Sequence, residues 1–224
     1  MDSCSARPVN LSALVPPGIF VGTSLILRQG GRFLYGIRPS RLEGQRCILE
    51  LTGIGGGLEP KDPSLSAGVL REAQEEMGCS VRLLPCSETL VVRGPACVER
   101  VRLQGEEQPT AVVFRRYRTP PHQPWHEENR GEACLVVFLA ELDGQPWPTM
   151  ELPTLAWLRP AYVVQTAQQD VSLRELLDAG VGFVEREPGC LPATAWVRLT
   201  DSQEALVLAL GNQALSYYRQ LVGE

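Results

Sequence analysis

The segment REAQEE carries three glutamates at positions that a helix would bring together. Glu72, Glu75 and Glu76 stand at i, i+3 and i+4, so a helix projects their carboxylates from one face. Like charges at this spacing destabilise an isolated helix by about a few tenths of a kcal/mol per pair. A hard divalent cation, which prefers oxygen ligands, would offset that repulsion, and a solvated acidic face is the alternative. An apolar opposite face and a preceding glycine cluster favour the metal site.

The helix that carries these acids is predicted over residues 64–78. Its opposite face repeats apolar or small side chains with the 3.6-residue helical period, at Leu65, Val69, Leu70, Ala73 and Met77. Gly78 suits the position after the last helical residue. Asp62 and Pro63 are typical of a helix start, with the aspartate as the cap. The glycine cluster GIGGG at 53–57 comes just before, so we expect a docked helix beside a tight glycine turn.

Residues 56–79 resemble the signature of the Nudix hydrolase family, G-x5-E-x7-R-E-U-x-E-E-x-G-U, in which U is a bulky apolar residue. The second half of this signature is matched by Arg71, Glu72, Ala73, Glu75, Glu76, Gly78 and Cys79. The first half departs from it. Counting from Gly57 keeps the family spacing but places Pro63 at the glutamate position. Counting from Gly56 places Asp62 there and Glu59 in the usual GGxxE slot, and we prefer this count.

The resemblance implies a hydrolase acting on acid anhydrides, which cleaves the pyrophosphate linkage of a nucleoside diphosphate joined to another group. That group can make a nucleotide sugar, ADP-ribose, a dinucleotide or an NTP. The implied cofactor is Mg²⁺ or Mn²⁺, and the implied metal ligands are the backbone of Gly56 and the side chains of Glu72, Glu75 and Glu76. Arg71 is expected to pair with one of these carboxylates and fix its orientation.

The general base is less closely defined. In many relatives it is a glutamate in the loop before the last strand, where Glu151 lies. Three other acids compete with it just before a long apolar strand, namely Glu127, Glu128 and Glu132. Glu59 is expected either to be structural or to touch an outer metal or the substrate.

Arginines cluster on two segments that we expect to be neighbouring strands. They are Arg100, Arg102, Arg115, Arg116 and Arg118. Arginine suits bidentate binding of phosphate, so Arg100, Arg115 and Arg116 are candidate substrate-binding residues together with Glu59. A basic edge strand that resists aggregation is the alternative.

The resemblance covers about residues 17–180 and implies an α/β class fold, an α/β/α sandwich with a mixed β-sheet. The strands expected within it include a hairpin over 20–37 that turns at Gln29-Gly30-Gly31, and strands over 47–51, 133–142 and 155–158. Residues 1–16 are predicted to be a loose lead-in. Residues 181–224 are predicted to be a C-terminal extension that packs on the domain or on a homodimer partner. Its last element is expected to be a long helix from a Thr200 cap to about Val222.

The composition of the chain argues against some classes of binding partner. The chain has 224 residues, 21 basic and 26 acidic side chains, and a net charge of -5, which opposes binding to nucleic acid or to an anionic membrane. Seven cysteines without regular spacing, no signal peptide and no long apolar run predict a cytoplasmic protein with reduced thiols.

Two alternatives to an enzyme remain open. One is a ligand-sensing transcriptional regulator with a Nudix-like domain and a DNA-binding C-terminal segment. Residues 151–224 oppose it, because five arginines against nine acids leave them at -4, whereas a DNA-binding segment is basic. The other is a catalytically silent nucleotide-binding module.

Overall fold

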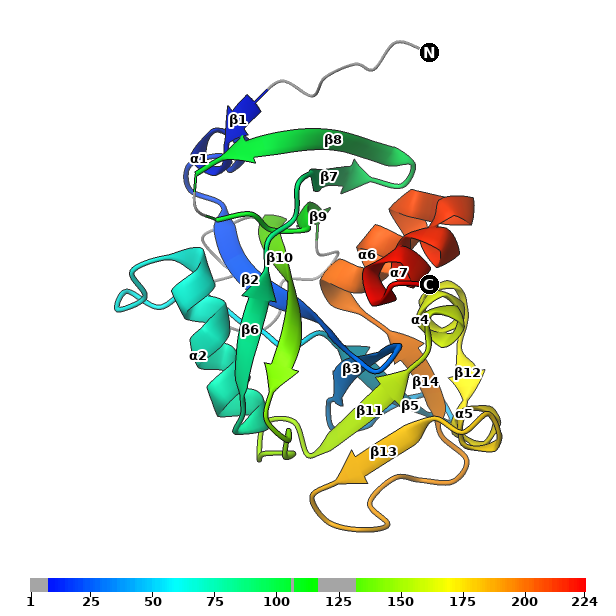
Figure 1. The fold of residues 1–224 in the computed structure, drawn as a ribbon. Coiled ribbons are helices and arrows are strands. Elements are labelled where there is room, and N and C mark those ends of the chain that lie inside the picture. Colours follow the sequence, from blue (N-terminus) through cyan, green and yellow to red (C-terminus); the bar gives the residue numbers. More distant parts are fainter. Residues whose placement is uncertain (1–7, 106, 117–131) are drawn as a thin grey trace.

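The computed structural model describes residues 8–105, 107–116 and 132–224, which form a mixed β-sheet between two layers of helices (Figure 1). The strands are β1 (Pro8–Asn10), β2 (Phe20–Gln29), β3 (Arg32–Ile37), β4 (Arg41–Glu43), β5 (Arg46–Thr52), β6 (Ser80–Leu84), β7 (Thr89–Gly94), β8 (Cys97–Gln104), β9 (Ala111–Arg116), β10 (Glu132–Asp143), β11 (Thr154–Leu158), β12 (Val171–Ser172), β13 (Gly182–Glu185) and β14 (Trp196–Leu199). The helices are α1 (Leu11–Leu14), α2 (Leu65–Met77), α4 (Pro160–Gln168), α5 (Leu173–Asp178), α6 (Asp201–Leu210) and α7 (Ala214–Val222), with a 3-10 turn at Gly211–Gln213. The predicted α/β class is confirmed.

The long strands β10 and β2 run parallel at the centre of the sheet. The strand order is β1-β8-β7-β9-β10-β2-β3-β5-β14-β12, and β11 pairs with β3 while β6 pairs with β10. The hairpin of β2 and β3 turns at Gly30 and Gly31, whose φ angles are 55° and 74°. Two consecutive positive φ angles are what a two-residue hairpin turn requires, so the predicted hairpin is confirmed.

Each face of the sheet has its own apolar core. On one face α2 packs Val69, Ala73 and Met77 against buried strand residues. On the other face, Val163 of α4 and Leu206 of α6 belong to a second cluster. Figure 1 shows α2 on one side of the strands and α4, α6 and α7 on the other. Every one of these five side chains is fully buried, so burial of apolar surface fixes both helix layers on the sheet.

The last part of the chain is built into this sheet. β14 pairs in parallel with β5, and β13 pairs antiparallel with β11. The domain boundary at residue 180 stays a prediction. The single long helix expected up to Val222 is wrong, because the chain breaks at Gly211 with φ 52° and ψ -124° and restarts as α7. Thr200 does not cap α6 with its side chain, because its hydroxyl donates to the carbonyl of Leu51 at 3.0 Å.

Within the described residues, none of the helices has the length and apolar character needed to cross a membrane. Cysteines in that part of the chain are free thiols, at Cys47, Cys79, Cys86, Cys97, Cys134 and Cys190.

Candidate active site

The N-cap of helix α2 lies two residues after the predicted aspartate cap. Ser64 is the N-cap, and its hydroxyl accepts a hydrogen bond from the backbone N–H of Ala67 at 3.1 Å. Asp62 therefore is not the cap, and that prediction is wrong. Its carboxylate instead accepts from Arg71 Nε at 3.1 Å and Nη2 at 3.0 Å, and from the backbone N–H of Glu59 at 2.8 Å. A buried arginine that offers two donors outcompetes backbone capping for this carboxylate.

Arg71 is the hub of the charges around α2. Its side chain is only 14% exposed. Besides Asp62, it contacts Glu72 Oε1 at 2.8 Å, Glu75 Oε2 at 2.7 Å and Glu59 Oε1 at 3.5 Å. It also donates to the carbonyl of Gly57 at 3.1 Å. One guanidinium thus holds the glycine turn and two of the three helical glutamates in place.

Glu76 lies on the inner side of the same helix and is 8% exposed. Its Oε2 accepts from the backbone N–H of Gly55 at 2.8 Å. The pKa of Glu76 is raised to about 8, chiefly by burial and also by the like charges of Glu72 and Glu151, against the opposing effects of the hydrogen bond from Gly55 and the positive charge of Arg38. The carboxylate is therefore held where its negative charge is poorly compensated.

The glycine turn fits against β2 and α2 because Gly55 and Gly56 have no side chains. The backbone N–H of Thr23 donates to the carbonyl of Gly56 at 2.8 Å. Gly55 has φ 150°, and a Cβ there would lie 2.1 Å from the carbonyl oxygen of Thr23. A Cβ on Gly56 would lie 2.6 Å from Glu72 Oε1. The glycines thus allow the turn to approach both a strand backbone and a carboxylate.

A cleft of about 910 Å³ opens between the glycine turn, α2 and the start of α6. The acids that line it are Glu59, Glu72, Glu76, Glu151 and Asp201. The predicted residues Gly56, Glu59, Glu72, Glu76 and Glu151 thus meet at one place. Glu75 and Arg71 are not among the lining residues, and Glu75 is exposed and paired with Arg71.

The cleft fits a hard divalent cation by the chemistry of its donors. Glu72, Glu76 and Glu151 offer carboxylate oxygens, and the carbonyl of Gly56 keeps a second lone pair beside the bond from Thr23. The Thr23 hydroxyl is buried and has no hydrogen-bond partner among the described residues. Across that part of the chain, no three His, Cys, Asp or Glu side chains are already gathered in a metal-binding geometry. Arg71 holds Glu72, and Gly55 holds Glu76, which explains why the acids stay apart.

Desolvation also raises the pKa of Glu72, against the opposing effect of Arg71. Both cleft carboxylates on α2 are therefore shifted in the same direction by burial. Such shifts, in a cleft with convergent polar groups, are typical of functional sites.

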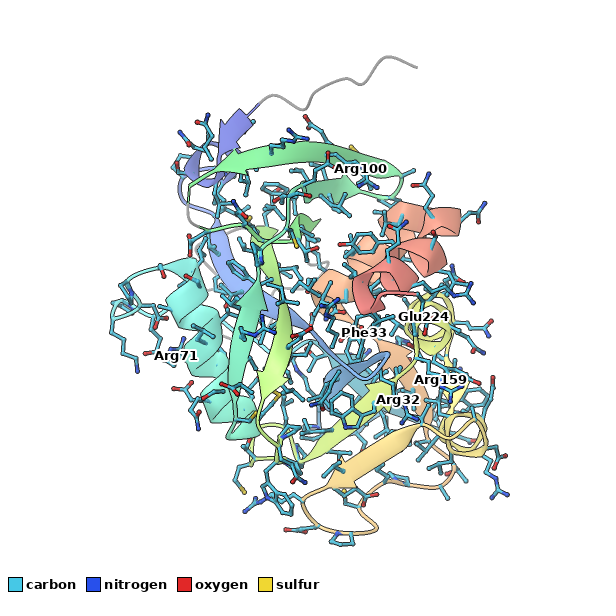
Figure 2. The ribbon with its side chains drawn as sticks, in the orientation of Figure 1. Arg32, Phe33, Arg71, Arg100, Arg159 and Glu224 are labelled. Atoms are coloured by element: carbon cyan, nitrogen blue, oxygen red, sulfur yellow. The ribbon has the colours of Figure 1, made fainter. Side chains whose placement is uncertain are left out.

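Arg100 and Arg115, the two candidate substrate-binding arginines whose side chains the structure describes, are not brought together, because the strands are not ordered as in the sequence. β7 lies between β8 and β9, so Arg100 and Arg115 are not on neighbouring strands. Arg100 is exposed beside Glu88 at 3.5 Å, and Figure 2 shows it far from Arg71. Arg115 pairs with Glu204 at 2.7 Å. Neither lines the acidic cleft.

Some predictions fall on residues of which the structure describes little or nothing. Glu127, Glu128 and Arg118 lie outside the described residues, as does the side chain of Arg116. Glu132, the third competitor of Glu151, starts β10 and lines a different cavity.

Two cleft residues were missed by sequence reasoning, Arg38 and Asp201. Arg38 Nη2 lies 3.6 Å from Asp201 Oδ2, and the same oxygen accepts from the Thr52 hydroxyl at 3.1 Å. Asp201 has a φ of 63°, a left-handed conformation that is costly for a residue other than glycine and clusters at functional sites. The one available signal was the position of Arg38 directly after a predicted strand. Nothing in the sequence links it to Asp201, which lies 163 positions away.

No protein-family model and no curated protein sequence matches the chain. Several solved structures are similar to it. Nudix hydrolases recur among them. A Nudix hydrolase from Nitrosomonas europaea is 16% identical with a TM-score of 0.43, over 78% of this chain and 96% of that one. A possible asymmetric diadenosine tetraphosphate hydrolase from Jonesia denitrificans is 12% identical with a TM-score of 0.49, over 92% and 98% of the two chains. A MutT Nudix hydrolase from Burkholderia pseudomallei is 21% identical with a TM-score of 0.37, over 63% and 84%.

Proposed function

We propose that the protein is a divalent-metal-dependent hydrolase that cleaves the pyrophosphate linkage of a nucleoside diphosphate joined to another group. The observation that carries the proposal is the convergence of Glu72, Glu76 and Glu151 with the glycine turn and Arg38 in one cleft. Oxygen donors for a cation and an arginine for phosphate are the two requirements of pyrophosphate hydrolysis. Their meeting in one cavity supports this chemistry over a purely structural acidic helix.

In this proposal Glu72, Glu76 and the carbonyl of Gly56 hold Mg²⁺ or Mn²⁺. The cation, when bound, neutralises charge on the phosphoryl oxygens. Arg38 lines the cleft with a half-exposed guanidinium, which donates hydrogen bonds to the phosphate oxygens. Glu151 accepts the proton of the attacking water as the general base.

Other residues orient this machinery. Arg71 fixes the carboxylate of Glu72 at 2.8 Å, and the N–H of Gly55 fixes that of Glu76 at 2.8 Å. Asp201 holds Arg38 at the opposite wall, at 3.6 Å. Arg71 lies outside the cleft lining, whereas Gly55 and Asp201 belong to it; together these residues keep the reactive groups aligned.

The test is turnover of a panel of nucleotide sugars, ADP-ribose, dinucleotides and NTPs with Mg²⁺ or Mn²⁺, followed by phosphate release. Glu76→Gln is expected to lower turnover by more than about 100-fold because it removes a charged oxygen ligand. Glu187→Gln is the matched control, since Glu187 is an exposed acid outside the cleft.

Equal inertness of the wild type and Glu76→Gln across the panel would refute the enzyme and leave the silent binding module. Retention of the wild type on heparin would instead favour the DNA-binding regulator, even though the acidic C-terminal segment opposes that function. Binding to nucleotide without turnover separates these two outcomes.

A further inference from the structure

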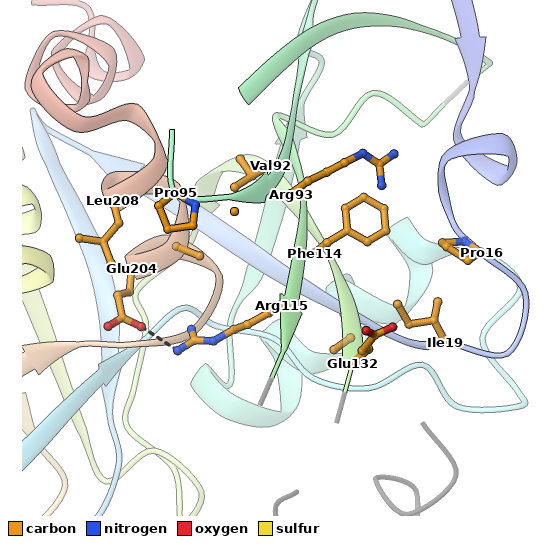
Figure 3. A pocket seen from close by; sticks show the side chains of 13 residues that line it. Pro16, Ile19, Val92, Arg93, Pro95, Phe114, Arg115, Glu132, Glu204 and Leu208 are labelled. Atoms are coloured by element: carbon orange, nitrogen blue, oxygen red, sulfur yellow. Dashed lines mark hydrogen bonds and ion pairs between the residues drawn. The ribbon is translucent and has the colours of Figure 1, made fainter. Parts of the chain in front are cut away.

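A second cavity of about 920 Å³ lies beside the acidic cleft, between the strands β7, β9 and β10 and the helix α6. Figure 3 shows Leu208 of α6 on one side of it and Phe114 of β9 on the other. Its volume suits a ligand the size of a nucleoside. Two of the residues predicted from the sequence, Arg115 and Glu132, line it, and the proposed reaction uses neither.

The walls of this cavity offer both stacking surface and hydrogen-bonding groups. Leu208 is 45% exposed, which leaves apolar surface on α6 facing the solvent. The guanidinium of Arg93 lies 4.3 Å from the centre of the Phe114 ring, an arrangement that holds the ring in a fixed orientation. Glu204 adds carboxylate oxygens to the same wall. Flat apolar surface with polar groups at its edge matches an aromatic heterocycle better than an aliphatic chain.

The cavity adjoins the acidic cleft. Ile19 lines both of them. Arg115 connects their walls, because one guanidinium nitrogen donates to the backbone carbonyl of Asp201 in the cleft and the other pairs with Glu204 at 2.7 Å. Neighbouring residues of α6, Ser202 and Glu204, face the two spaces. The two spaces therefore lie side by side, which a single ligand that occupies both of them requires.

We propose that this second cavity binds the aromatic base of a nucleotide whose phosphates lie in the acidic cleft, with the base packed against Phe114 and Leu208. The proposal rests on the proposed function for the position of the phosphates. It assigns substrate recognition to α6, in the C-terminal segment that lies beyond the Nudix resemblance. Ion-paired Arg115 then lies where the two parts of the site meet.

The experiment measures binding of AMP, GMP, CMP and UMP to the full chain in Mg²⁺ by calorimetry, with ribose 5-phosphate as the probe that lacks a base. At least one nucleotide is expected to bind about tenfold more tightly than ribose 5-phosphate, the range that stacking of one base supplies. Leu208→Trp fills the cavity and is expected to remove that preference. Leu177→Trp is the matched control, because Leu177 is a 49% exposed leucine on another helix.

Equal affinity of the wild type for ribose 5-phosphate and all four nucleotides would overturn the proposal. So would an unchanged preference in Leu208→Trp, with a thermal melt showing that this variant is folded. A preference abolished by Leu208→Trp and kept by Leu177→Trp supports it. Failure of the hydrolysis panel with this binding pattern intact would refute the reaction and not the base-binding cavity.

Discussion

Alanine substitutions at the adjacent glycines Gly55 and Gly56 should have different consequences, one for stability and the other for turnover. At Gly55 the new Cβ would lie 2.1 Å from the carbonyl oxygen of Thr23 and 2.7 Å from the Cα of Ser24. Both are backbone atoms of a central strand and cannot move aside. At Gly56 the new Cβ would meet the carboxylate of Glu72 at 2.6 to 2.8 Å, which is the far end of a flexible side chain and can swing away. The first change strains the fold, and the second displaces a proposed metal ligand.

The magnitudes follow from what each clash disrupts. Gly55→Ala places a side chain at φ 150°, which costs about 1–3 kcal/mol. It also pushes apart the hydrogen bond from the N–H of Gly55 to Glu76, and leaving this buried carboxyl without its partner adds about 1–3 kcal/mol. We expect a loss of roughly 3 kcal/mol or more in the free energy of unfolding. Gly56→Ala loosens the ion pair of Glu72 with Arg71, but Arg71 retains its ion pair with Asp62. We therefore expect the free energy of unfolding to change by less than about 1 kcal/mol.

Urea unfolding followed by circular dichroism measures the stability of both variants, and phosphate release in Mg²⁺ measures their turnover. Gly55→Ala should unfold at lower urea concentration. Gly56→Ala should unfold like the wild type and lose most of its turnover. A Gly56→Ala variant with wild-type turnover would refute the placement of Glu72 in the active site. A Gly55→Ala variant with wild-type stability would refute the close packing of the glycine turn on β2.

Three further results are expected. Gln203→Leu should lower the free energy of unfolding by about 2–4 kcal/mol in urea, because it leaves the buried hydroxyl of Tyr35 without its acceptor at 2.6 Å; equal stability would contradict this. The pKa of Asp170 is lowered by its arginine partner Arg198. The ionised carboxylate therefore stabilises the folded protein at pH values above the pKa that Asp170 has in the unfolded chain, and this contribution is lost as the pH falls through its pKa in the folded protein. Melting curves from pH 6 down to about pH 3 should therefore converge for wild type and Asp170→Asn, and parallel curves would argue against it. Burial raises the pKa of the Cys134 thiol to about 12, so mass spectrometry should find Cys97 alkylated in the native protein and Cys134 alkylated only after unfolding.

The acidic helix could be predicted because its information is local. The 3.6-residue period placed most of the apolar face correctly, since Val69, Ala73 and Met77 are buried, but Leu70, which was assigned to the same face, is 40% exposed. The cap was wrong because Arg71, nine residues from Asp62, competes for that carboxylate through a tertiary contact. Local propensity carries no record of such a competitor.

The arginine cluster failed for a reason of topology. The prediction assumes that strands that follow one another in the sequence are neighbours, whereas β7 lies between β8 and β9. The pairing of Arg38 with Asp201 was missed on the same grounds, because it depends on β14 returning beside β5 and delivering the start of α6 to the cleft. Contacts between distant segments depend on sheet order, which residue spacing alone does not encode.

The charges around α2 give a further reason to expect a cation. Arg71 lies within 4 Å of Glu59, Asp62, Glu72 and Glu75, and Lys61 pairs with Glu59 at 3.0 Å. Two positive charges therefore face four negative ones, before the buried Glu76 is counted. Arg71 thus relieves only part of the repulsion among the carboxylates. The remaining excess of two negative charges equals in size the charge of one divalent cation. Because Arg71 is anchored by Asp62 and by the carbonyl of Gly57, Glu72 can turn toward a bound cation while the guanidinium stays in place.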